Sequence, residues 1–107
     1  MKQGRVMNND LEAGILSKLD DGTYVFEYND TYYRDDAKPP ISLTLPKLQK
    51  QHTSKTLFPF FFNLLSEGSN RELQSIRLKI DKEDHFSLLL KTAAHETIGA
   101  IRVEEIS

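Results

Sequence analysis

Apolar and polar residues alternate along the first third of the chain, and this period of two predicts β-strands. Gly14 to Leu19 is followed by an Asp-Asp-Gly turn at 20–22, after which Tyr24 to Tyr28 places three aromatic side chains on one face. Aspartate followed by glycine is typical of a tight hairpin, because glycine adopts positive φ without strain. Gln3 to Asn8 predicts one more strand, which an Asn-Asn-Asp turn separates from the next.

The middle of the chain contains a proline-containing loop and one short apolar alternation. The segment Asp35 to Pro40 ends in two prolines, which neither a helix interior nor a central strand accommodates. Ile41 to Leu45 then alternates between apolar and polar residues, which predicts a short strand with one buried face. The polar run Lys47 to Ser54 lacks periodicity, and we expect it to be a loop.

The second half changes to helical periodicity. Apolar residues between Leu57 and Leu65 recur at helical spacing, which predicts a helix that begins near Ser54 or Thr56 and ends at Gly68. A capping box at 69–72 predicts a second helix, and acids at 81–84 predict the start of a third. The segment 97–106 closes the chain as a strand. The pattern predicts a single α+β domain, 1–107, with an antiparallel sheet of about four to five strands and about three helices.

The composition narrows the class of protein. A length of 107 residues fits one domain, and the absence of cysteine excludes disulfide frameworks and thiolate sites. No apolar stretch follows the N-terminal segment 1–5, and the longest apolar cluster is far too short to span a membrane, so we expect a cytoplasmic protein. A net charge of −2 argues against direct nucleic-acid binding.

The charges are unevenly placed along the chain. No acidic residue lies in the segment 37–66, which contains Lys38, Lys47, Lys50 and Lys55. Such a segment could steer an acidic partner onto one face of the domain. A solvated loop that happens to be basic explains the pattern equally well, and both interpretations stay open.

The titratable residues do not indicate a catalytic or metal site. His52, His85 and His95 are far apart in the sequence, so nothing in the sequence brings three or four metal ligands together. The adjacent carboxylates fall at turns, helix starts and the chain end, where turn formation and capping explain them. Nucleophile-elbow, P-loop and dinucleotide fingerprints are missing. We therefore expect a chain that is not an enzyme and uses neither a metal nor a cofactor.

Four phenylalanines within 58–62 raise a question of exposure. One helix face cannot hide all of them, since Phe60 lies off the main apolar stripe. Either the core of a small domain is crowded, or Phe60 belongs to an exposed patch for a partner, because aromatic side chains carry much of the energy of an interface.

Several segments together resemble the N-terminal domain of HipA-type kinases. They are Lys-Pro-Pro-Ile-Ser-Leu-Thr-Leu-Pro at 38–46, Phe-Phe-Asn-Leu-Leu-Ser-Glu-Gly at 61–68, Asp-His-Phe-Ser-Leu-Leu at 84–89 and Ile-Gly-Ala-Ile at 98–101. An early pattern of asparagines, a glycine and a leucine between Asn8 and Leu16 also fits. The segments follow the order of the family and cover nearly the whole chain.

The resemblance implies a binding module without chemistry of its own. In full-length HipA kinases this domain precedes a Ser/Thr kinase core. In three-component relatives a separate copy, HipS, accompanies a kinase, HipT, and a DNA-binding protein, HipB, and the small protein is the antitoxin that docks on the kinase. We therefore expect a HipT/HipA-like Ser/Thr kinase as the partner and a HipB-like protein as a further one.

The resemblance also implies where the partner would bind. The turn between the first two predicted helices is expected to face the kinase, and its contact residues are Leu65, Ser66, Glu67, Gly68 and Asn70. Phe60 and the lysines Lys47, Lys50 and Lys55 are secondary candidates. Ser66 stands where the family usually has proline, and because serine is a small wedge, this departure weakens a steric-plug mechanism while leaving docking intact.

Other functions stay open at this point. The domain could complete or stabilise the kinase instead of inhibiting it, or act in a HipB-type repressor complex that contacts DNA only through its partner. It could also be a fragment of a longer kinase, although the polar segment 104–107 favours a natural end.

Overall fold

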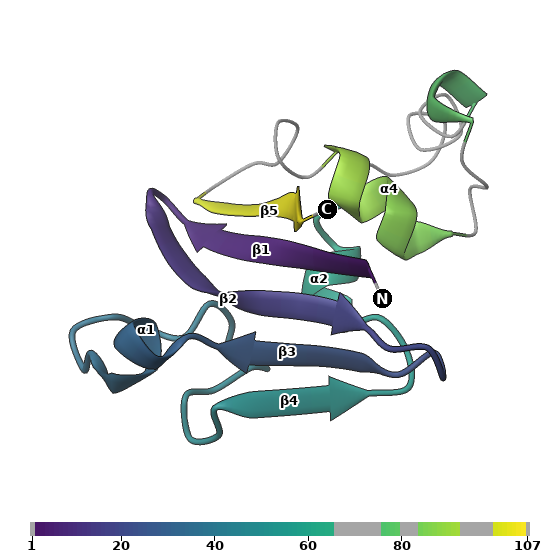
Figure 1. Cartoon of the computed structure of the whole chain (residues 1–107). Helices are drawn as coiled ribbons and strands as arrows, with labels where there is room; N and C mark the ends of the chain where they lie inside the picture. Colours follow the sequence, from purple (N-terminus) through teal and green to yellow (C-terminus); the bar gives the residue numbers. More distant parts are fainter. Residues whose placement is uncertain (1, 66–75, 80–83, 93–99, 107) are drawn as a thin grey trace.

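The chain forms one five-stranded antiparallel sheet with short helices on one of its faces (Figure 1). The computed structural model describes residues 2–65, 76–79, 84–92 and 100–106. The strand order is β4-β3-β2-β1-β5. The elements in chain order are β1 (Lys2–Asn8), β2 (Leu11–Lys18), β3 (Tyr24–Tyr28), α1 (Asp30–Arg34), β4 (Gln51–Ser54), α2 (Pro59–Phe62), α4 (His85–Thr92) and β5 (Ile101–Ile106). The predicted α+β class and antiparallel sheet are confirmed.

Strand β1 lies between the second strand of the chain and the last one. It pairs with β2 through the turn at Asn9, whose φ is 55°, and with β5 from Gln3↔Ile106 to Asn8↔Ile101. Asparagine tolerates this left-handed conformation better than most residues, as the predicted Asn-Asn-Asp turn requires. The β2–β3 hairpin turns at Gly22, whose φ is 91°, and this confirms the predicted Asp-Gly turn.

The core lies between the sheet and the helices and is largely aromatic. Phe26 of β3 is fully buried and contacts both Tyr28 and Phe61, with ring centroids 4.8 Å and 5.6 Å away. Tyr24 meets Phe86 of α4 edge to face at 5.6 Å. Such pairs add to the energy of burial because the ring edges and faces carry opposite partial charges. The aromatic residues of β3 therefore hold both α2 and α4 on the sheet.

Two glycines allow close approach inside this sheet. A Cβ on Gly14 would lie 2.2 Å from the carbonyl oxygen of Glu27 on β3. A Cβ on Gly4 would lie 2.6 Å from Val103 and 2.7 Å from Leu90, so the missing side chain lets α4 pack directly on β1. Both positions are buried, and neither has room for a methyl group.

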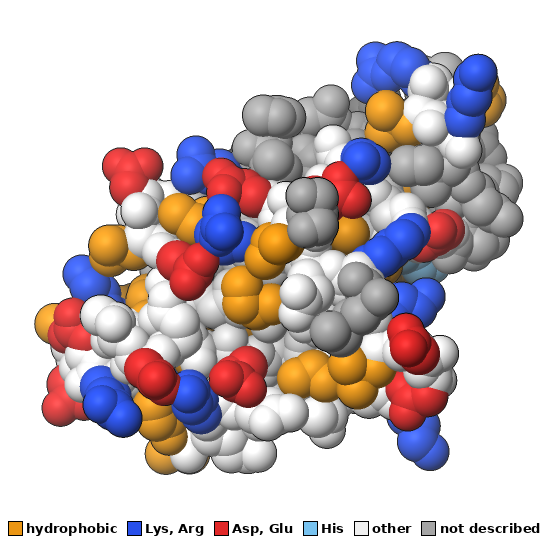
Figure 2. Space-filling model, in the orientation of Figure 1, with side chains coloured by type: hydrophobic (Ala, Val, Ile, Leu, Met, Phe, Trp, Pro, Cys, Tyr) orange, Lys and Arg blue, Asp and Glu red, His pale blue; other side chains and the backbone are white. Residues whose placement is uncertain are grey.

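None of the described helices covers the other face of the sheet, which is turned toward the viewer in Figures 1 and 2. Figure 2 shows charged and apolar side chains interspersed on it. Arg5 crosses the strands there, with its Nε 2.7 Å from Glu12 and its Nη1 3.9 Å from Glu104. Half-buried Ile15 and Val25 lie between such polar neighbours. This is the mixed surface expected of an antiparallel sheet with one solvated face.

Two local predictions in the middle of the chain are wrong. The segment 41–45 is not a strand but a sequence of bends and turns, in which the amide of Leu45 donates to the carbonyl of Ser42 (3.1 Å). The predicted loop at 47–54 instead contains β4 at Gln51–Ser54. An edge strand of four polar residues shows no apolar period, because its side chains are only half-buried or exposed.

The helix predictions hold in part. Helix α2 begins at Pro59, later than predicted, because Ser54 still belongs to β4; the proline occupies the first turn, where its missing amide costs nothing. Helix α4 matches the third predicted helix, whereas the capping box at 69–72 lies outside the described residues. Helix α1 was not predicted, although the Asn29 side chain caps it by accepting from the Tyr32 amide at 2.8 Å.

Candidate partner-binding site

The contact turn expected from the resemblance is only partly described. Leu65 is 5% exposed and belongs to the core, so its side chain packs inside the domain just after the end of α2. Phe60 is half-buried and meets Phe61 edge to face, with ring centroids 5.2 Å apart. This packing favours the crowded-core interpretation of Phe60. The remaining expected contacts, Ser66, Glu67, Gly68 and Asn70, lie outside the described residues.

Lys50 is engaged within its own domain. Its ammonium forms an ion pair with Asp30 at the start of α1 and lies 3.8 Å from a carboxylate oxygen of Glu27 on β3. The hydrogen bond from Lys50, followed by its charge, lowers the pKa of Asp30, and the same hydrogen bond raises the pKa of Lys50. Two carboxylates of the same domain therefore offset the positive charge of Lys50.

Lys47 precedes β4 in the chain, and Lys55 follows directly after it. The Lys47 ammonium donates to the carbonyl oxygens of Asp35 and Lys38, both at 2.7 Å, and lies 5.3 Å from the centre of the Tyr32 ring. Lys55 is exposed and lines a hollow near α4. The structure does not bring the three lysines together into one basic patch.

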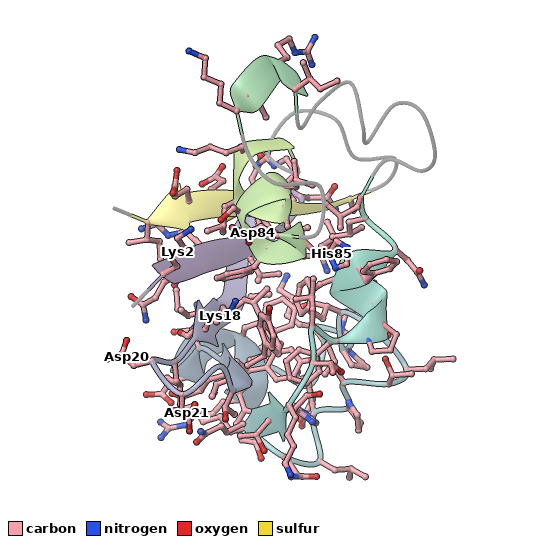
Figure 3. All side chains as sticks on the ribbon, turned by 90° about the vertical axis from the view of Figure 1, so that its right-hand side faces the viewer. Lys2, Lys18, Asp20, Asp21, Asp84 and His85 are labelled. Atoms are coloured by element: carbon pink, nitrogen blue, oxygen red, sulfur yellow. The ribbon has the colours of Figure 1, made fainter. Side chains whose placement is uncertain are left out.

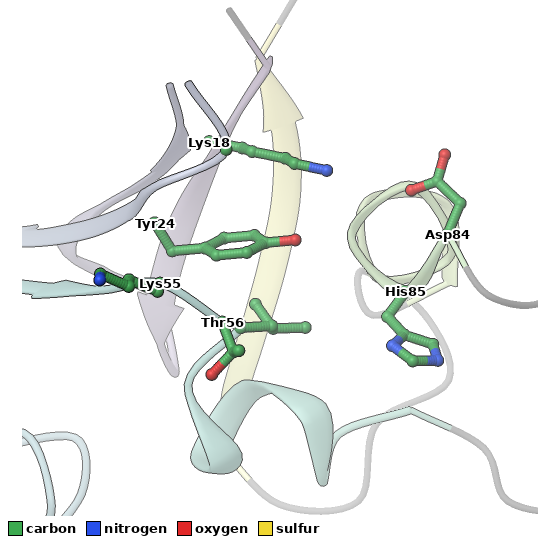
Figure 4. A pocket seen from close by; sticks show the side chains of 8 residues that line it. Lys18, Tyr24, Lys55, Thr56, Asp84 and His85 are labelled. Atoms are coloured by element: carbon green, nitrogen blue, oxygen red, sulfur yellow. The ribbon is translucent and has the colours of Figure 1, made fainter. Parts of the chain in front are cut away.

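The hollow next to Lys55 has a volume of about 570 Å³ and lies between the β2–β3 hairpin and the start of α4 (Figures 3 and 4). Lys18 points across it toward Asp84, and the Tyr24 ring lies between them and Thr56. Lys18 also lies over the Tyr24 ring, 5.6 Å from its centre. The residues that line this hollow are Lys18, Gly22, Tyr24, Lys55, Thr56, Leu57, Asp84 and His85.

The hollow has the chemistry of a polar surface depression. Asp84 accepts a hydrogen bond from the amide of Ser87 at 3.2 Å, and Lys2 donates to the Ser87 hydroxyl at 2.5 Å. The ring of His85 packs edge to face on Phe62, with centroids 4.8 Å apart. These contacts explain Asp84 as the cap of α4, because a carboxylate at a helix start satisfies unpaired amides.

A second surface feature is the segment 41–48, which we name the Leu43–Leu48 loop. Its Leu43 and Leu48 side chains are 95% and 91% exposed. The sequence pattern placed Leu43 on a buried strand face together with Ile41 and Leu45, and this prediction is wrong for Leu43. Ile41 and Leu45 are buried as predicted, but in a loop.

Side chains from the sheet hold this loop at several points. The hydroxyl of Tyr28 accepts from the amide of Ile41 at 3.1 Å and donates to the carbonyl of Leu45. The carbonyl of Pro46 accepts from Nε2 of His52 at 2.9 Å. Burial raises the pKa of Tyr28, so its hydroxyl stays protonated and keeps both bonds across the physiological pH range. The sequence gives no sign of this arrangement, because the bonds join residues far apart in the chain.

The family described as the HipA N-terminal domain matches residues 4–104. The chain belongs to the HipA N-terminal domain family. Both the Leu43–Leu48 loop and the hollow beside α4 lie inside the matched residues.

Two relatives and one solved structure show the contexts of this HipA N-terminal domain. A protein of Haemophilus influenzae with no described function is 30% identical over 105 residues, which are 98% of this chain and 93% of that protein. A protein of Sinorhizobium fredii named as a predicted kinase, Y4dM, is 31% identical over 97 residues, 85% of this chain but only 24% of the kinase. A solved N-terminal domain of HipA toxin superposes with a TM-score of 0.75, at 27% identity, over 100% of this chain and 94% of that one.

The described part of this HipA N-terminal domain shows no metal-binding cluster. Across residues 2–65, 76–79, 84–92 and 100–106, no three His, Asp or Glu side chains lie close enough together to hold an ion. Within the same ranges, no helix has the length and apolar character needed to cross a membrane.

The carboxylate of Asp84 is expected to make the stability of this HipA N-terminal domain depend on pH. Burial acts to raise its pKa, but the hydrogen bonds from Ser87 and the charges of Lys2 and Lys18 outweigh burial and lower the pKa below its ordinary value of 3.8. The charged form is therefore favoured in the folded state, and its stabilisation is present above pH 4 and lost as the pH falls through the lowered pKa.

The variant Asp84→Asn separates this charge from capping, since asparagine caps helices about as well as aspartate. At pH 7 we expect the variant to be less stable by about 0.5 kcal/mol, the usual scale of a charge at an exposed helix start. Urea unfolding at pH 7 and pH 3 measures the difference. A gap that fails to shrink at pH 3 would contradict a role for the charge.

Proposed function

We propose that this domain docks on a separate HipA-like Ser/Thr kinase and neutralises it, as the antitoxin of a split toxin–antitoxin system. The observation that carries this proposal is the context of its relatives. The same domain makes up about a quarter of the predicted kinase Y4dM, whereas the Haemophilus relative consists almost entirely of it. A domain that occurs both within a kinase chain and as a small protein is suited to bind that kinase from outside.

The action of the domain in this proposal is binding alone. In the hollow beside α4, Asp84 caps the helix, and Lys18 and His85 lie against aromatic rings. The family to which it belongs is the N-terminal, non-catalytic part of HipA proteins. We therefore assign catalysis to the partner and none to this chain.

Neutralisation requires the domain to bind one kinase conformation better than another. A kinase must close around ATP and magnesium to transfer phosphate. A ligand that prefers the open form shifts the equilibrium only by its difference in affinity for the two forms. To convert a population from 99% closed to 99% open, that difference must be about 10⁴-fold. Docking that is about 10⁴-fold tighter on the open kinase than on the closed kinase supplies this difference.

The test is co-expression with the kinase encoded beside this chain, with co-purification and host-cell growth as readouts. A stable complex together with rescue of growth supports the antitoxin. A stable complex without rescue favours a structural subunit that completes the kinase. No complex, or no kinase gene beside this chain, overturns the proposal.

A reconstituted assay separates inhibition from support more directly. Purified domain is titrated into the purified kinase, and autophosphorylation and the melting temperature of the kinase are followed. An antitoxin lowers the rate at stoichiometric amounts, whereas a structural subunit raises the rate and the melting temperature together. A kinase with its ATP-binding lysine replaced serves as the background control for phosphate transfer.

A further inference from the structure

We infer that the Leu43–Leu48 loop is a preorganised docking surface, which inserts two leucines into an apolar groove with an acidic rim on the partner kinase. The inference rests on the proposed function and adds the surface through which the partner is bound. It concerns a different segment from the contact residues that the resemblance implies, which lie between 65 and 70.

The exposure of the two leucines is the first observation. Leu43 and Leu48 are 95% and 91% exposed, whereas Leu45 between them is 2% exposed. Single exposed leucines are common on protein surfaces and need no explanation. Here, however, two nearly bare leucines flank a buried one in the same short loop, so the loop directs one leucine inward and two outward. A protein surface that buries both would gain from each.

The tethering of the loop is the second observation. The hydroxyl of Tyr28 bonds to both Ile41 and Leu45, one on each side of Leu43, and His52 holds the carbonyl of Pro46 at 2.9 Å. These bonds fix the backbone before any partner binds. A loop that is already ordered loses less conformational entropy on binding, and this raises its affinity.

A second group of bonds holds the base of the loop. The Lys47 ammonium links the carbonyls of Asp35 and Lys38, and the Tyr32 hydroxyl donates to the carbonyl of Pro39 at 2.7 Å. The domain therefore uses several buried or half-buried polar side chains to fix the conformation of a loop whose most prominent side chains are apolar and exposed. Core packing alone does not account for this arrangement.

The charges around the loop indicate the chemistry of the partner. Among the described residues, no carboxylate lies within 4.0 Å of the ammonium groups of Lys38 and Lys47, in contrast to Lys50. The segment 37–66 contains no acid of its own. An apolar groove with carboxylates at its rim matches two leucines next to Lys38, whereas Lys47 already donates to the carbonyl oxygens of Asp35 and Lys38.

The same charges argue against a second copy of this chain as the occupant. In a twofold dimer through this loop, each copy would present the same patch to the other, so the basic segment 37–66 would meet a second basic segment and no carboxylate of its own. Like charges brought together in an interface are unfavourable. In the predicted kinase Y4dM, by contrast, the related domain shares its chain with three times its own length of further sequence. We therefore assign the loop to the kinase.

The experiment measures the affinity of the full domain for the ATP-site-inactivated kinase encoded beside it, by titration calorimetry. The double variant Leu43→Ser with Leu48→Ser is expected to weaken binding about 100-fold, since each leucine contributes about tenfold. The matched control is Leu19→Ser, which changes a leucine that is 37% exposed in the β2–β3 hairpin. The control is expected to bind as the wild type does, and both variants should keep the wild-type circular dichroism.

The variant Tyr28→Phe tests preorganisation, because it keeps both leucines and removes two of the bonds that hold the loop, those to Ile41 and Leu45. We expect about tenfold weaker binding, together with faster hydrogen exchange at the Ile41 amide.

The variant Lys38→Gln tests the acidic rim, and it should reduce the loss of affinity seen on raising salt from 50 to 500 mM.

The inference and the proposed function can fail separately. If the wild-type domain does not bind the kinase, the proposed function fails. If the wild type binds and the double leucine variant binds equally well, the inference is overturned while the proposed function stands. Concentration-dependent dimerisation in sedimentation velocity that the double variant abolishes would also overturn it, because the occupant would then be a second copy.

Discussion

Replacing Phe61 with alanine is expected to lower the free energy of unfolding of this domain by about 4 kcal/mol. The Phe61 side chain is fully buried in α2. Its ring contacts those of Phe26, Phe58 and Phe60, with centroids 5.6, 6.1 and 5.2 Å away. Alanine would leave a cavity where α2 meets the sheet, and the surrounding rings cannot close it completely.

The neighbouring Phe60→Ala is the matched control. Phe60 belongs to the same helix, and its replacement by alanine removes the same number of atoms. The Phe60 side chain, however, is only half-buried. We expect a loss of about 1.5 kcal/mol, since part of its ring is already in water. Urea unfolding followed by circular dichroism measures both. Equal losses at the two positions would show that Phe60 belongs fully to the core.

Replacing Gly14 with alanine is expected to cost about 3 kcal/mol, which is at the upper end of the range for overpacking. The added Cβ would lie 2.2 Å from the carbonyl oxygen of Glu27, and that oxygen belongs to the backbone of a paired strand. Neither atom can move away without separating β2 from β3. Thermal unfolding of the variant measures the loss.

Gly22→Ala provides the contrast, because it isolates backbone conformation from crowding. Its φ is 91°, and a Cβ there would meet no atom within 4 Å. We expect a cost of about 1 kcal/mol, from the left-handed conformation alone. If Gly14→Ala proved cheaper than Gly22→Ala, the close approach of β2 and β3 at Gly14 would not be a constraint on the fold.

The strands that share a buried face could be predicted from the sequence. The alternation at Tyr24–Tyr28 and the Asp-Gly turn before it are both local, and they are sufficient to define the β2–β3 hairpin. The terminal strand was also predicted, although β5 begins at Ile101 and the segment 97–99 lies outside the described residues. Local periodicity was informative for these strands, whose alternate side chains face the core.

The middle of the chain could not be predicted in the same way. Ile41 to Leu45 has the alternation of a strand, but the Tyr28 hydroxyl bonds to both ends of this segment and holds it as a loop. The residues of β4 are polar and lie at the sheet edge, so no apolar period reveals them. Helix α1 has only five residues, which is too few for periodicity to be recognised. Long-range bonds decided these elements.

The candidate site was the least accessible to sequence reasoning. A run without acids suggested one basic patch, yet the acids that offset Lys50 come from β3 and α1, which precede it in the chain. The exposure of Leu43 was hidden for a related reason, since an apolar residue in an alternating pattern is ordinarily predicted to be buried. The sequence shows which charges and apolar groups are present, but the tertiary contacts determine which of them face outward.

The position of β1 between β2 and β5 has a consequence for synthesis on the ribosome. Among the strands of this domain, β1 leaves the ribosomal exit tunnel first. It can pair with β2 as soon as β2 has emerged, but its other edge stays open until β5 has emerged. Until then, the core residue Val6 of β1 lacks Val103, its cross-strand neighbour on β5. An unpaired strand edge next to exposed apolar side chains is a site for misassociation of nascent chains. Chaperone capture during translation should therefore end only when the segment 101–106 is free to pair.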